Sequence, residues 1–575
     1  MFITNRCPGS LVGPWGICRH GARISSGMGW MGGMGIMRLL ARVLFILVFG
    51  RFAQGAEDAG QWIVVTSPEL RPALEPLIAD RGAEGFKVVI LDTGELLSQE
   101  QRHQGNGTLL KKRVEGQVQG FKGRSYLLLA GPFNTAGLTN SDNIVLPALR
   151  GAVGRMKGEP SDSGYGLPGD DGMSRMAVGR LPARNRGELS GMVQKTLEFE
   201  HDVKPAPWRN RLALLLGNPG GGMLAEMFMQ QSLKAHLAPL HPSWQVRTVF
   251  NVASSPFYLP RPQDREAAVR YIEEGDMFSI YCGHSGPAGM GMDERFIPRK
   301  DWATLNIVQG RGPFFTCGCF CCQMKGTNEA YGVAAVRNPA GPVAVIGAME
   351  ESFSAPGQLA VEGFLSCLTN APFPPRLGDY WLSVQAGLAR GGMDAATFAM
   401  MDVMDGTEGK VPLATQRQEH LEMWLLLGDP ALRMPVVPAD IPLKAQGPLV
   451  CGKTIEISGG LPRRLSGAEV RLTIERPLTS EPIELEMVPK NSQETREARV
   501  KAFEANHQRA NSFVVSSALK KSVGTNFSVS MKLGDAMPWS NVVIRATATV
   551  SNEMGFGVLV LPVGERMAEN GGAAH

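Results

Sequence analysis

Short apolar runs alternate with helix-like segments between residues 60 and about 430. Runs of β-branched and aliphatic residues separated by amphipathic helices indicate parallel sheets covered by helices, so we expect an α/β fold. A loop-rich stretch and a break near Pro207 divide the pattern into two subdomains, residues 56–206 and 207–438. The expected strands are Gln61–Thr66, Lys87–Leu91, Ser125–Ala130, Leu212–Leu216, Gln245–Val249, Met277–Tyr281, Pro313–Thr316 and Pro342–Ile346, and the expected helices are Glu69–Arg81, Asn185–His201, Leu224–Leu237 and Asp264–Glu274.

The hydrophobic pattern changes beyond about residue 445, where apolar and polar residues alternate. Val470–Ile474 and Val542–Ala548 show this period of two most clearly. A period of two is typical of strands with one buried face, and it predicts a small, immunoglobulin-like β-sandwich over residues 439–575. A charged segment between about 488 and 510 interrupts it, and its composition favours a helix.

The first 55 residues differ from the rest of the chain. Arg38 and Arg42 precede the apolar run Val43–Phe49, and Ala53-Gln54-Gly55 places small residues two apart. A basic start, a short apolar core and a small-x-small exit are typical of a secretory signal peptide. We therefore expect translation to start at Met37, cleavage near Gly55, and an exported protein that is extracellular, on the cell surface or periplasmic.

Composition narrows the possible partners. The chain has 575 residues, of which 43% are hydrophobic and 19% charged, which excludes a disordered or collagen-like protein. Six of its 58 basic residues and none of its 54 acidic ones lie in residues 1–55, so the remainder carries a net charge of −2. Such a balance gives no reason to expect a nucleic acid partner. The run Val43–Phe49 is too short to span a bilayer, so we expect no integral membrane segment in the mature protein.

The candidate chemistry lies between residues 276 and 353. One predicted strand ends in Cys282-Gly283-His284-Ser285-Gly286, and the next ends in Cys317-Gly318-Cys319-Phe320. Because side chains at the carboxyl ends of neighbouring parallel strands meet in one crevice, we expect an imidazole and a thiol at one site. A thiolate is a nucleophile, and a nearby histidine can stabilise it and then protonate the leaving amine.

This order of motifs resembles the caspase-like clan of cysteine peptidases and, more closely, the gingipain family. The resemblance covers roughly residues 60 to 560. It rests on Gly283-His284, Gly318-Cys319, the run Pro342–Ala348 followed by Glu351-Ser352-Phe353, the motif Leu427-Gly428-Asp429-Pro430-Ala431-Leu432, and Ser161-Asp162 with Tyr165.

The resemblance implies a cysteine-type endopeptidase that acts on proteins or peptides through a thioester. Cys319 would be the nucleophile, with Cys317 as the alternative, and His284 the general acid and base. The backbone N–H of Cys319 and one near Ser285 and Gly286 would form the oxyanion hole. In the same scheme Phe353 would line the substrate pocket and Asp162 would give it a negative floor. The orienting partner of the histidine is open, with Asp276 as one candidate.

Two other functions are compatible with these residues. Family members usually place glycine after the histidine, whereas this chain has Ser285. A catalytically inactive adhesion or binding protein is therefore one alternative. A serine hydrolase that uses Ser285 is the other, although Pro287 stands where a nucleophile elbow needs glycine.

Seven cysteines follow the signal peptide, and four of them fall within residues 317–322. An odd number leaves at least one free thiol. A single tract on one strand end is a poor zinc site, and we expect no metal there. No cofactor is required by the chemistry above, although the resemblance makes a structural calcium ion possible near Gly169–Gly172.

Overall fold

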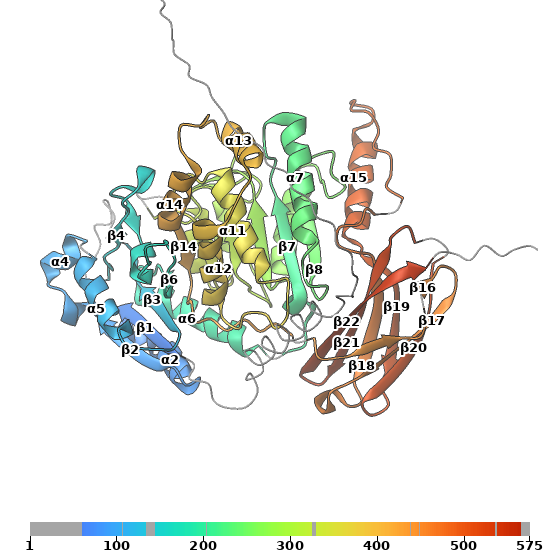
Figure 1. The fold of residues 1–575 in the computed structure, drawn as a ribbon, viewed down its shortest axis with the longest axis horizontal. Coiled ribbons are helices and arrows are strands. Elements are labelled where there is room, and N and C mark those ends of the chain that lie inside the picture. The colour runs from blue at the N-terminus through green and yellow to red at the C-terminus, as the bar shows by residue number, and fades with distance from the viewer. Residues whose placement is uncertain are drawn as a thin grey trace, which may run out of the picture. The chain divides into compact units, whose positions relative to one another are not determined.

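Ten strands of the computed structural model form one sheet, in the order β2-β1-β3-β6-β14-β13-β12-β9-β7-β8 (Figure 1). The sequence predicts two subdomains, and the structure joins their strands in this single sheet. In sheet order the strands are β2 (Lys87–Asp92), β1 (Gln61–Thr66), β3 (Ser125–Ala130), β6 (Ala177–Leu181), β14 (Trp424–Leu427), β13 (Val345–Ala348), β12 (Phe314–Thr316), β9 (Phe278–Cys282), β7 (Arg211–Leu216) and β8 (Gln245–Phe250).

The sheet consists of two parallel halves that run in opposite directions. All neighbours from β2 to β14 are parallel, as are all neighbours from β13 to β8. The two halves meet where β13 and β14 pair antiparallel, with Val345 opposite Leu427. The carboxyl ends of strands in one half therefore lie at the amino-end edge of the other half.

The strands of the large sheet form where the sequence has short, mostly apolar runs. Every residue of β1 and β3 is buried, as is typical of a parallel sheet covered on both faces. Each strand expected from the sequence is present, although the run predicted at Pro342–Ile346 is a strand only over Val345–Ala348. β14 was not expected, because its residues directly follow a helix with no turn residue between them.

Helices connect the strands. The four helices predicted from the sequence are present with small shifts as α2 (Arg71–Ala83), α6 (Arg186–His201), α7 (Gly222–Leu237) and α8 (Gln263–Glu273). The others are α3 (Thr93–Leu96), α4 (Gln99–His103), α5 (Thr108–Val118), α9 (Arg299–Thr304), α10 (Tyr331–Arg337), α11 (Ser354–Ser366), α12 (Leu377–Arg390), α13 (Ala395–Met404) and α14 (Leu413–Met423). Short elements are the 3₁₀ turns η1 (Gly154–Met156), η2 (Ser163–Gly166) and η3 (Pro207–Asn210), and the strands β4 (Leu149–Arg150), β5 (Pro160–Ser161), β10 (Ser285–Gly286) and β11 (Gly289–Met290).

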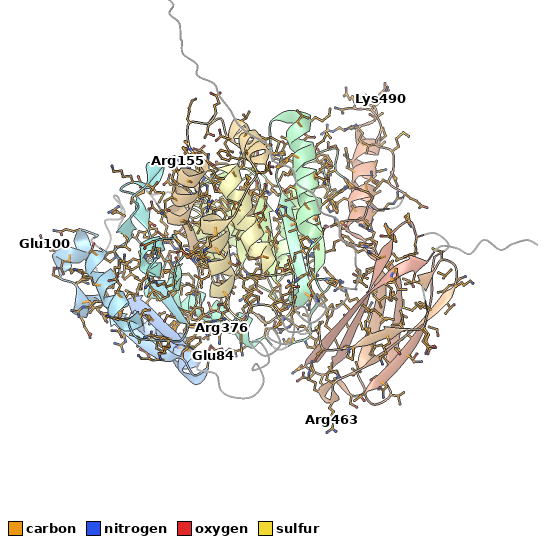
Figure 2. All side chains as sticks on the ribbon, viewed as in Figure 1. Glu84, Glu100, Arg155, Arg376, Arg463 and Lys490 are labelled. Atoms are coloured by element: carbon orange, nitrogen blue, oxygen red, sulfur yellow. The ribbon has the colours of Figure 1, made fainter. Side chains whose placement is uncertain are left out.

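A buried ion-pair cluster joins the first half of the sheet to the loop after β14. The Arg81 guanidinium lies 2.8 Å from the carboxylate of Asp429 and 2.9 Å from that of Glu200, and all three side chains are fully buried. Glu84 pairs with both Arg81 and Arg376, each at 3.0 Å (Figure 2). Since buried charges are tolerated only when they are paired, this cluster fixes how the Gly428-Asp429-Pro430 loop meets α2 and α6.

The C-terminal part contains two further sheets that share one apolar cluster. One sheet has the order β15-β17-β20 and the other β16-β22-β21-β18-β19. The charged insertion is helical, as expected, over α15 (Arg496–Asn511). The strands are β15 (Leu443–Ala445), β16 (Leu449–Val450), β17 (Thr454–Gly460), β18 (Glu469–Glu475), β19 (Val514–Lys521), β20 (Asn526–Lys532), β21 (Asn541–Val550) and β22 (Glu553–Gly564), with the turn η4 (Arg463–Leu465).

The structure describes residues 60–564 apart from residues 106, 134–143, 203, 325–328, 438, 448, 483 and 535–536. Internal contacts divide the chain into Met1–Glu57 and Asp58–His575. The expected signal peptide lies outside the described residues. Within them, no helix has the length and apolar character needed to cross a membrane.

Candidate active site

The two residues singled out by the sequence follow neighbouring strands. β9 and β12 are parallel, with Tyr281 opposite Thr316, so the segments after them leave the sheet at the same edge. His284 comes two residues after β9 and Cys319 three residues after β12. Both side chains line one cavity of about 240 Å³. The structure therefore brings the thiol and the imidazole to the same crevice.

The turn that carries Cys319 is closely packed. A Cβ atom added to Gly318 would lie 2.2 Å from the Ser285 hydroxyl oxygen, so only glycine fits before the cysteine. After the cysteine, Phe320 has a φ of +58°, an uncommon conformation for a residue with a side chain. The backbone N–H of Ser352 donates to the Cys319 sulfur at 3.3 Å. These contacts fix the position of the sulfur at the cavity wall.

Burial raises the pKa of the Cys319 thiol, and the N–H of Ser352 partly opposes this rise. Burial acts in this direction because it disfavours the charged form of a group, whereas a donor aimed at the sulfur favours the thiolate. In this arrangement the thiol is protonated at neutral pH. Its ionisation therefore requires a base to accept the proton.

His284 is an exposed residue, and its ring makes a hydrogen bond through Nε2. Its Nε2 donates a hydrogen bond to the backbone carbonyl oxygen of Pro219, 3.0 Å away, in the loop between β7 and α7. Because a carbonyl oxygen only accepts, Nε2 carries the proton, and in the neutral ring Nδ1 is left as the acceptor. The sequence could not indicate this partner, since a backbone carbonyl has no residue signature.

Asp276, the orienting residue considered from the sequence, is not placed near His284. It lies at the amino end of β9, whereas His284 follows the carboxyl end. Its carboxylate is 2.9 Å from the Arg211 guanidinium and 2.8 Å from that of Arg247. Asp276 therefore pairs with two arginines at the opposite edge of this half of the sheet.

Ser285 takes part in a chain of hydroxyl groups. The Tyr331 hydroxyl, itself 3.3 Å from Thr316 Oγ1, donates to Ser285 Oγ at 3.3 Å. Ser285 Oγ in turn donates to the Cys319 carbonyl oxygen at 2.7 Å. The serine hydroxyl thus supports the turn of Cys319. Because its proton is donated to the Cys319 carbonyl oxygen, this bond argues against Ser285 as a nucleophile. Gly286 pairs with Gly289 in the adjoining two-residue hairpin.

Phe353 lines the cavity and is held by a histidine that the sequence did not single out. Its ring stacks on His420 with centroids 5.9 Å apart, and the Arg155 guanidinium lies 3.9 Å from its ring centroid. The Phe353 N–H donates to His420 Nε2 at 2.9 Å, and Nδ1 of that ring donates to the Gln416 carbonyl at 2.6 Å. Burial lowers the pKa of His420 to about 3.

Asp162 is not part of this cavity. Its two carboxylate oxygens accept hydrogen bonds from the Arg180 guanidinium at 2.7 and 2.8 Å, and both side chains are buried. The structure thus overturns the expectation of a negative pocket floor at Asp162, because Arg180 already neutralises the charge. Asp171, near the expected calcium site, is paired with Arg390.

All seven cysteines of the described residues are free thiols. Cys282 ends β9 and Cys317 directly follows the adjacent strand β12, with their sulfurs 3.8 Å apart, and the neighbouring Cys321 and Cys322 sulfurs are 3.3 Å apart. Within the described part of the chain, no three or more histidine, cysteine or acidic side chains are grouped to hold a metal ion.

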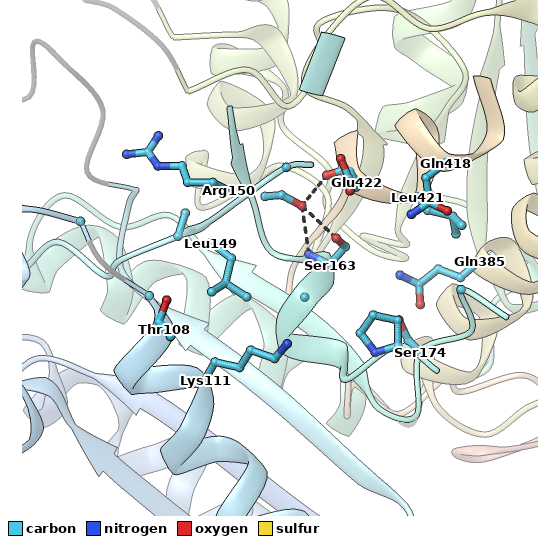
Figure 3. A pocket seen from close by; sticks show the side chains of 18 of the residues that line it. Thr108, Lys111, Leu149, Arg150, Ser163, Ser174, Gln385, Gln418, Leu421 and Glu422 are labelled. Carbon is cyan, nitrogen blue, oxygen red and sulfur yellow. Dashed lines mark hydrogen bonds between the residues drawn. The ribbon is translucent and has the colours of Figure 1, made fainter. Parts of the chain in front are cut away.

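A second, larger cavity of about 550 Å³ lies elsewhere on the molecule (Figure 3). Lys111, Arg150, Ser163 and Glu422 are among the side chains around it. No cysteine or histidine is among the described residues that line it, and the Glu422 carboxylate already accepts from two backbone N–H groups. It therefore offers no nucleophile and base pair comparable to the first cavity.

A thiol and an imidazole thus lie after adjacent strands of a parallel-rich α/β sheet and line one cavity. The model of Peptidase family C25 matches residues 56–435, and the chain belongs to this family, the gingipain family. No curated protein matches the sequence.

Solved structures are similar in fold. The crystal structure of the Arg-specific cysteine proteinase gingipain R shares 14% identity, with 89% of this chain and 99% of that chain covered and a TM-score of 0.51. The complex of the Porphyromonas gingivalis RgpB pro- and mature domains also shares 14% identity, with 88% and 100% covered and a TM-score of 0.49. At 14% identity, the similarity to gingipain R shows that this chain has the same caspase-like fold.

Proposed function

We propose that this chain is an exported cysteine endopeptidase in which Cys319 is the nucleophile and His284 the general acid and base. The observation that carries the proposal is that both side chains line one cavity at the ends of adjacent strands β12 and β9. Membership of Peptidase family C25 supports protein or peptide substrates.

In the proposed reaction, His284 Nδ1 accepts the proton of the Cys319 thiol as the sulfur attacks the scissile carbonyl carbon. The N–H groups of Cys319 and of the Ser285–Gly286 segment stabilise the negative charge that develops on the carbonyl oxygen. The C–N bond then breaks, and the protonated imidazole gives its proton to the leaving amine. Water, deprotonated by His284, attacks the resulting thioester and releases the acid product and the thiol.

Two neighbouring groups support this reaction in the proposal. The Pro219 carbonyl keeps the proton of the neutral ring on Nε2, which leaves Nδ1 free to act as a base. The Ser352 N–H, 3.3 Å from the sulfur, favours the thiolate once it forms. The reaction needs no cofactor.

The remaining parts of the proposal concern location and the C-terminal part. Export rests on the signal-like sequence of residues 37–55, which predicts an extracellular, cell-surface or periplasmic protein. The two sheets that share a core beyond residue 439 are consistent with the immunoglobulin-like sandwich that the sequence predicts. Neither feature takes part in the chemistry.

Two alternative functions predict different results in the activity test described below. An inactive adhesion or binding protein would retain the fold without turnover. A serine hydrolase would use Ser285, but the hydroxyl of that residue already donates to the Cys319 carbonyl oxygen.

The test compares single variants on a mixture of fluorogenic peptides. Cys319→Ala should abolish turnover, whereas the matched variant Cys317→Ala should retain it, since the hydrogen bond with Cys282 and burial raise the pKa of the Cys317 thiol well above its usual value. Iodoacetamide should modify Cys319 of the folded protein, as mapped by mass spectrometry. Turnover lost only in Ser285→Ala would establish the serine hydrolase, and no turnover with an unmodified Cys319 would establish the binding protein.

A further inference from the structure

The cavity at Cys319 and His284 continues inward as an apolar space. It lies against β7 and β9 and is enclosed by α7, α11 and α13, which Figure 1 shows on the same side of the sheet. Its walls are mostly aliphatic and aromatic, with Leu214, Phe228, Met229, Val361, Leu365 and Met401 as representative members. A side chain that enters beside the thiol would therefore meet hydrocarbon.

Charged groups of the cavity are few. Among the described lining residues, Asp405 has the single carboxylate, and there is no lysine or arginine. Its two oxygens accept from the Ser354 N–H at 2.7 Å and the Ser354 hydroxyl at 2.6 Å, at the start of α11. His236 is bonded to the Ser232 carbonyl and lies 3.8 Å from Glu362. A bound guanidinium or ammonium group would therefore meet a single carboxylate among the described lining residues, in walls that are mostly apolar.

Apolar side chains continue from the cavity to the surface beside His284. Met223, Leu224 and Met227 of α7 are 74%, 80% and 59% exposed. Met292 is 67% exposed, and a Cβ added to Gly220 would meet both its sulfur and His284 Nε2 within 4 Å. The approach to the candidate site is thus as apolar as its interior.

We propose that this cavity selects substrates in which the residue that supplies the scissile carbonyl, the acyl-side residue, has a large apolar side chain such as Leu, Phe or Met. The inference rests on the proposed function, because it places that residue beside Cys319. Burial of such a side chain is favourable. An arginine or lysine would lose its hydration against mostly apolar walls, with Asp405 as the single carboxylate among the described lining residues, and an alanine would leave the space empty.

The first test is a set of peptides that differ only in the acyl-side residue. Leu, Phe and Met should exceed Arg, Lys and Ala by about tenfold or more in kcat/KM. The same order should appear when peptidyl acyloxymethyl ketones carrying these residues label Cys319, measured by mass spectrometry. A preference for Arg or Lys, or for Ala, would overturn the inference while leaving the cysteine peptidase intact. No labelling of Cys319 by any probe would overturn both.

The second test fills the cavity from Gly357 of α11. A Cβ added there meets a single atom within 4 Å, Cys317 Cβ at 3.8 Å, so a larger side chain would extend into the space. Gly357→Leu should lower kcat/KM for Leu and Phe peptides at least tenfold and reverse the preference towards Ala. Gly116→Leu is the matched control, since Gly116 is an exposed residue of helix α5 with nothing within 4 Å of an added Cβ, and the variant should leave the profile unchanged.

A third variant tests whether the Asp405 carboxylate instead recognises a basic substrate residue. Asp405→Asn should keep the preference for apolar over basic residues, because the inference gives Asp405 no part in holding the substrate side chain. A loss of activity confined to Arg and Lys peptides in this variant would instead show that Asp405 recognises a basic residue, and would overturn the inference.

Discussion

His284 Nε2 lies 3.0 Å from the backbone carbonyl oxygen of Pro219 and donates a hydrogen bond to it. This carbonyl follows β7, the imidazole follows β9 and the thiol of Cys319 follows β12, and these three strands are consecutive neighbours in the sheet. The candidate site is thus built from three adjacent strand ends, with an uncharged oxygen as the partner of the histidine.

The Pro219 carbonyl belongs to the peptide bond that precedes Gly220, whose φ is +70°. A side chain in this left-handed conformation costs about 1–2 kcal/mol, and relief of the strain would rotate that peptide away from His284. Gly220→Ala should therefore lower kcat about tenfold with a smaller change in KM. Kinetics over a range of pH measure this, since the altered ring partner should also shift the profile.

Gly222→Ala provides the control for this prediction. Gly222 has a similar φ of +74°, and nothing lies within 4 Å of an added Cβ. Both variants place a side chain in the left-handed conformation at the same cost, but only Gly220→Ala changes the peptide bonded to His284. Equal losses in both would show that the Pro219 carbonyl does not position the ring.

Ser285→Ala should weaken the turn of Cys319 without removing the nucleophile. The lost bond is the one from Ser285 Oγ to the Cys319 carbonyl oxygen, 2.7 Å long, and such bonds contribute about 1 kcal/mol. We expect turnover to fall about fivefold while iodoacetamide still modifies Cys319. Tyr331→Phe keeps that bond and removes the hydroxyl that contacts Ser285 and Thr316, each at 3.3 Å, so its effect should be smaller. A larger loss in Tyr331→Phe would contradict this order.

The sequence was sufficient to place His284 and Cys319 together, because both follow apolar strand runs and neighbouring parallel strands end at one edge. It was not sufficient for β14, whose Trp424–Leu427 run follows α14 directly and reads as a continuation of that helix. Without β14 the two predicted subdomains have no shared sheet, and the reversal of strand direction at β13 cannot be foreseen.

Two partners in the site were equally hidden from sequence reasoning. The Pro219 carbonyl is a main-chain group, so no residue type in the sequence indicates that it binds His284. His420 is a single histidine in α14, and its contact with Phe353 depends on how distant helices pack. Asp162 shows the opposite error, because a motif suggested a free carboxylate where folding supplies Arg180 as a partner.

Asp162→Asn should destabilise the protein without changing substrate preference. The Arg180 side chain is fully buried, and breaking a buried ion pair leaves an uncompensated charge at a cost of about 3–5 kcal/mol. Urea unfolding measures the loss, and the peptide set above measures the preference. Asp171→Asn breaks an exposed pair with Arg390 and should remain close to wild type. A selective loss of activity on basic peptides in Asp162→Asn would restore it as a pocket residue.

His420 should make the protein less stable in acid. Its Nε2 accepts from the Phe353 N–H, so protonation would set two donors against each other, and burial lowers its pKa from 6.5 to about 3. Below pH 6.5 the unfolded chain gains a proton at this residue that the folded chain does not, so stability falls as the pH drops towards 3.

Between pH 7 and 5 this single group should remove about 2 kcal/mol of unfolding free energy. His420→Gln keeps an acceptor for the Phe353 N–H but cannot be protonated. Between pH 7 and 5 its free energy of unfolding should therefore fall by about 2 kcal/mol less than that of the wild type. Urea unfolding of both proteins at the two pH values measures the difference. Parallel pH dependences for wild type and His420→Gln would show that this ring does not couple the Phe353 wall of the site to pH.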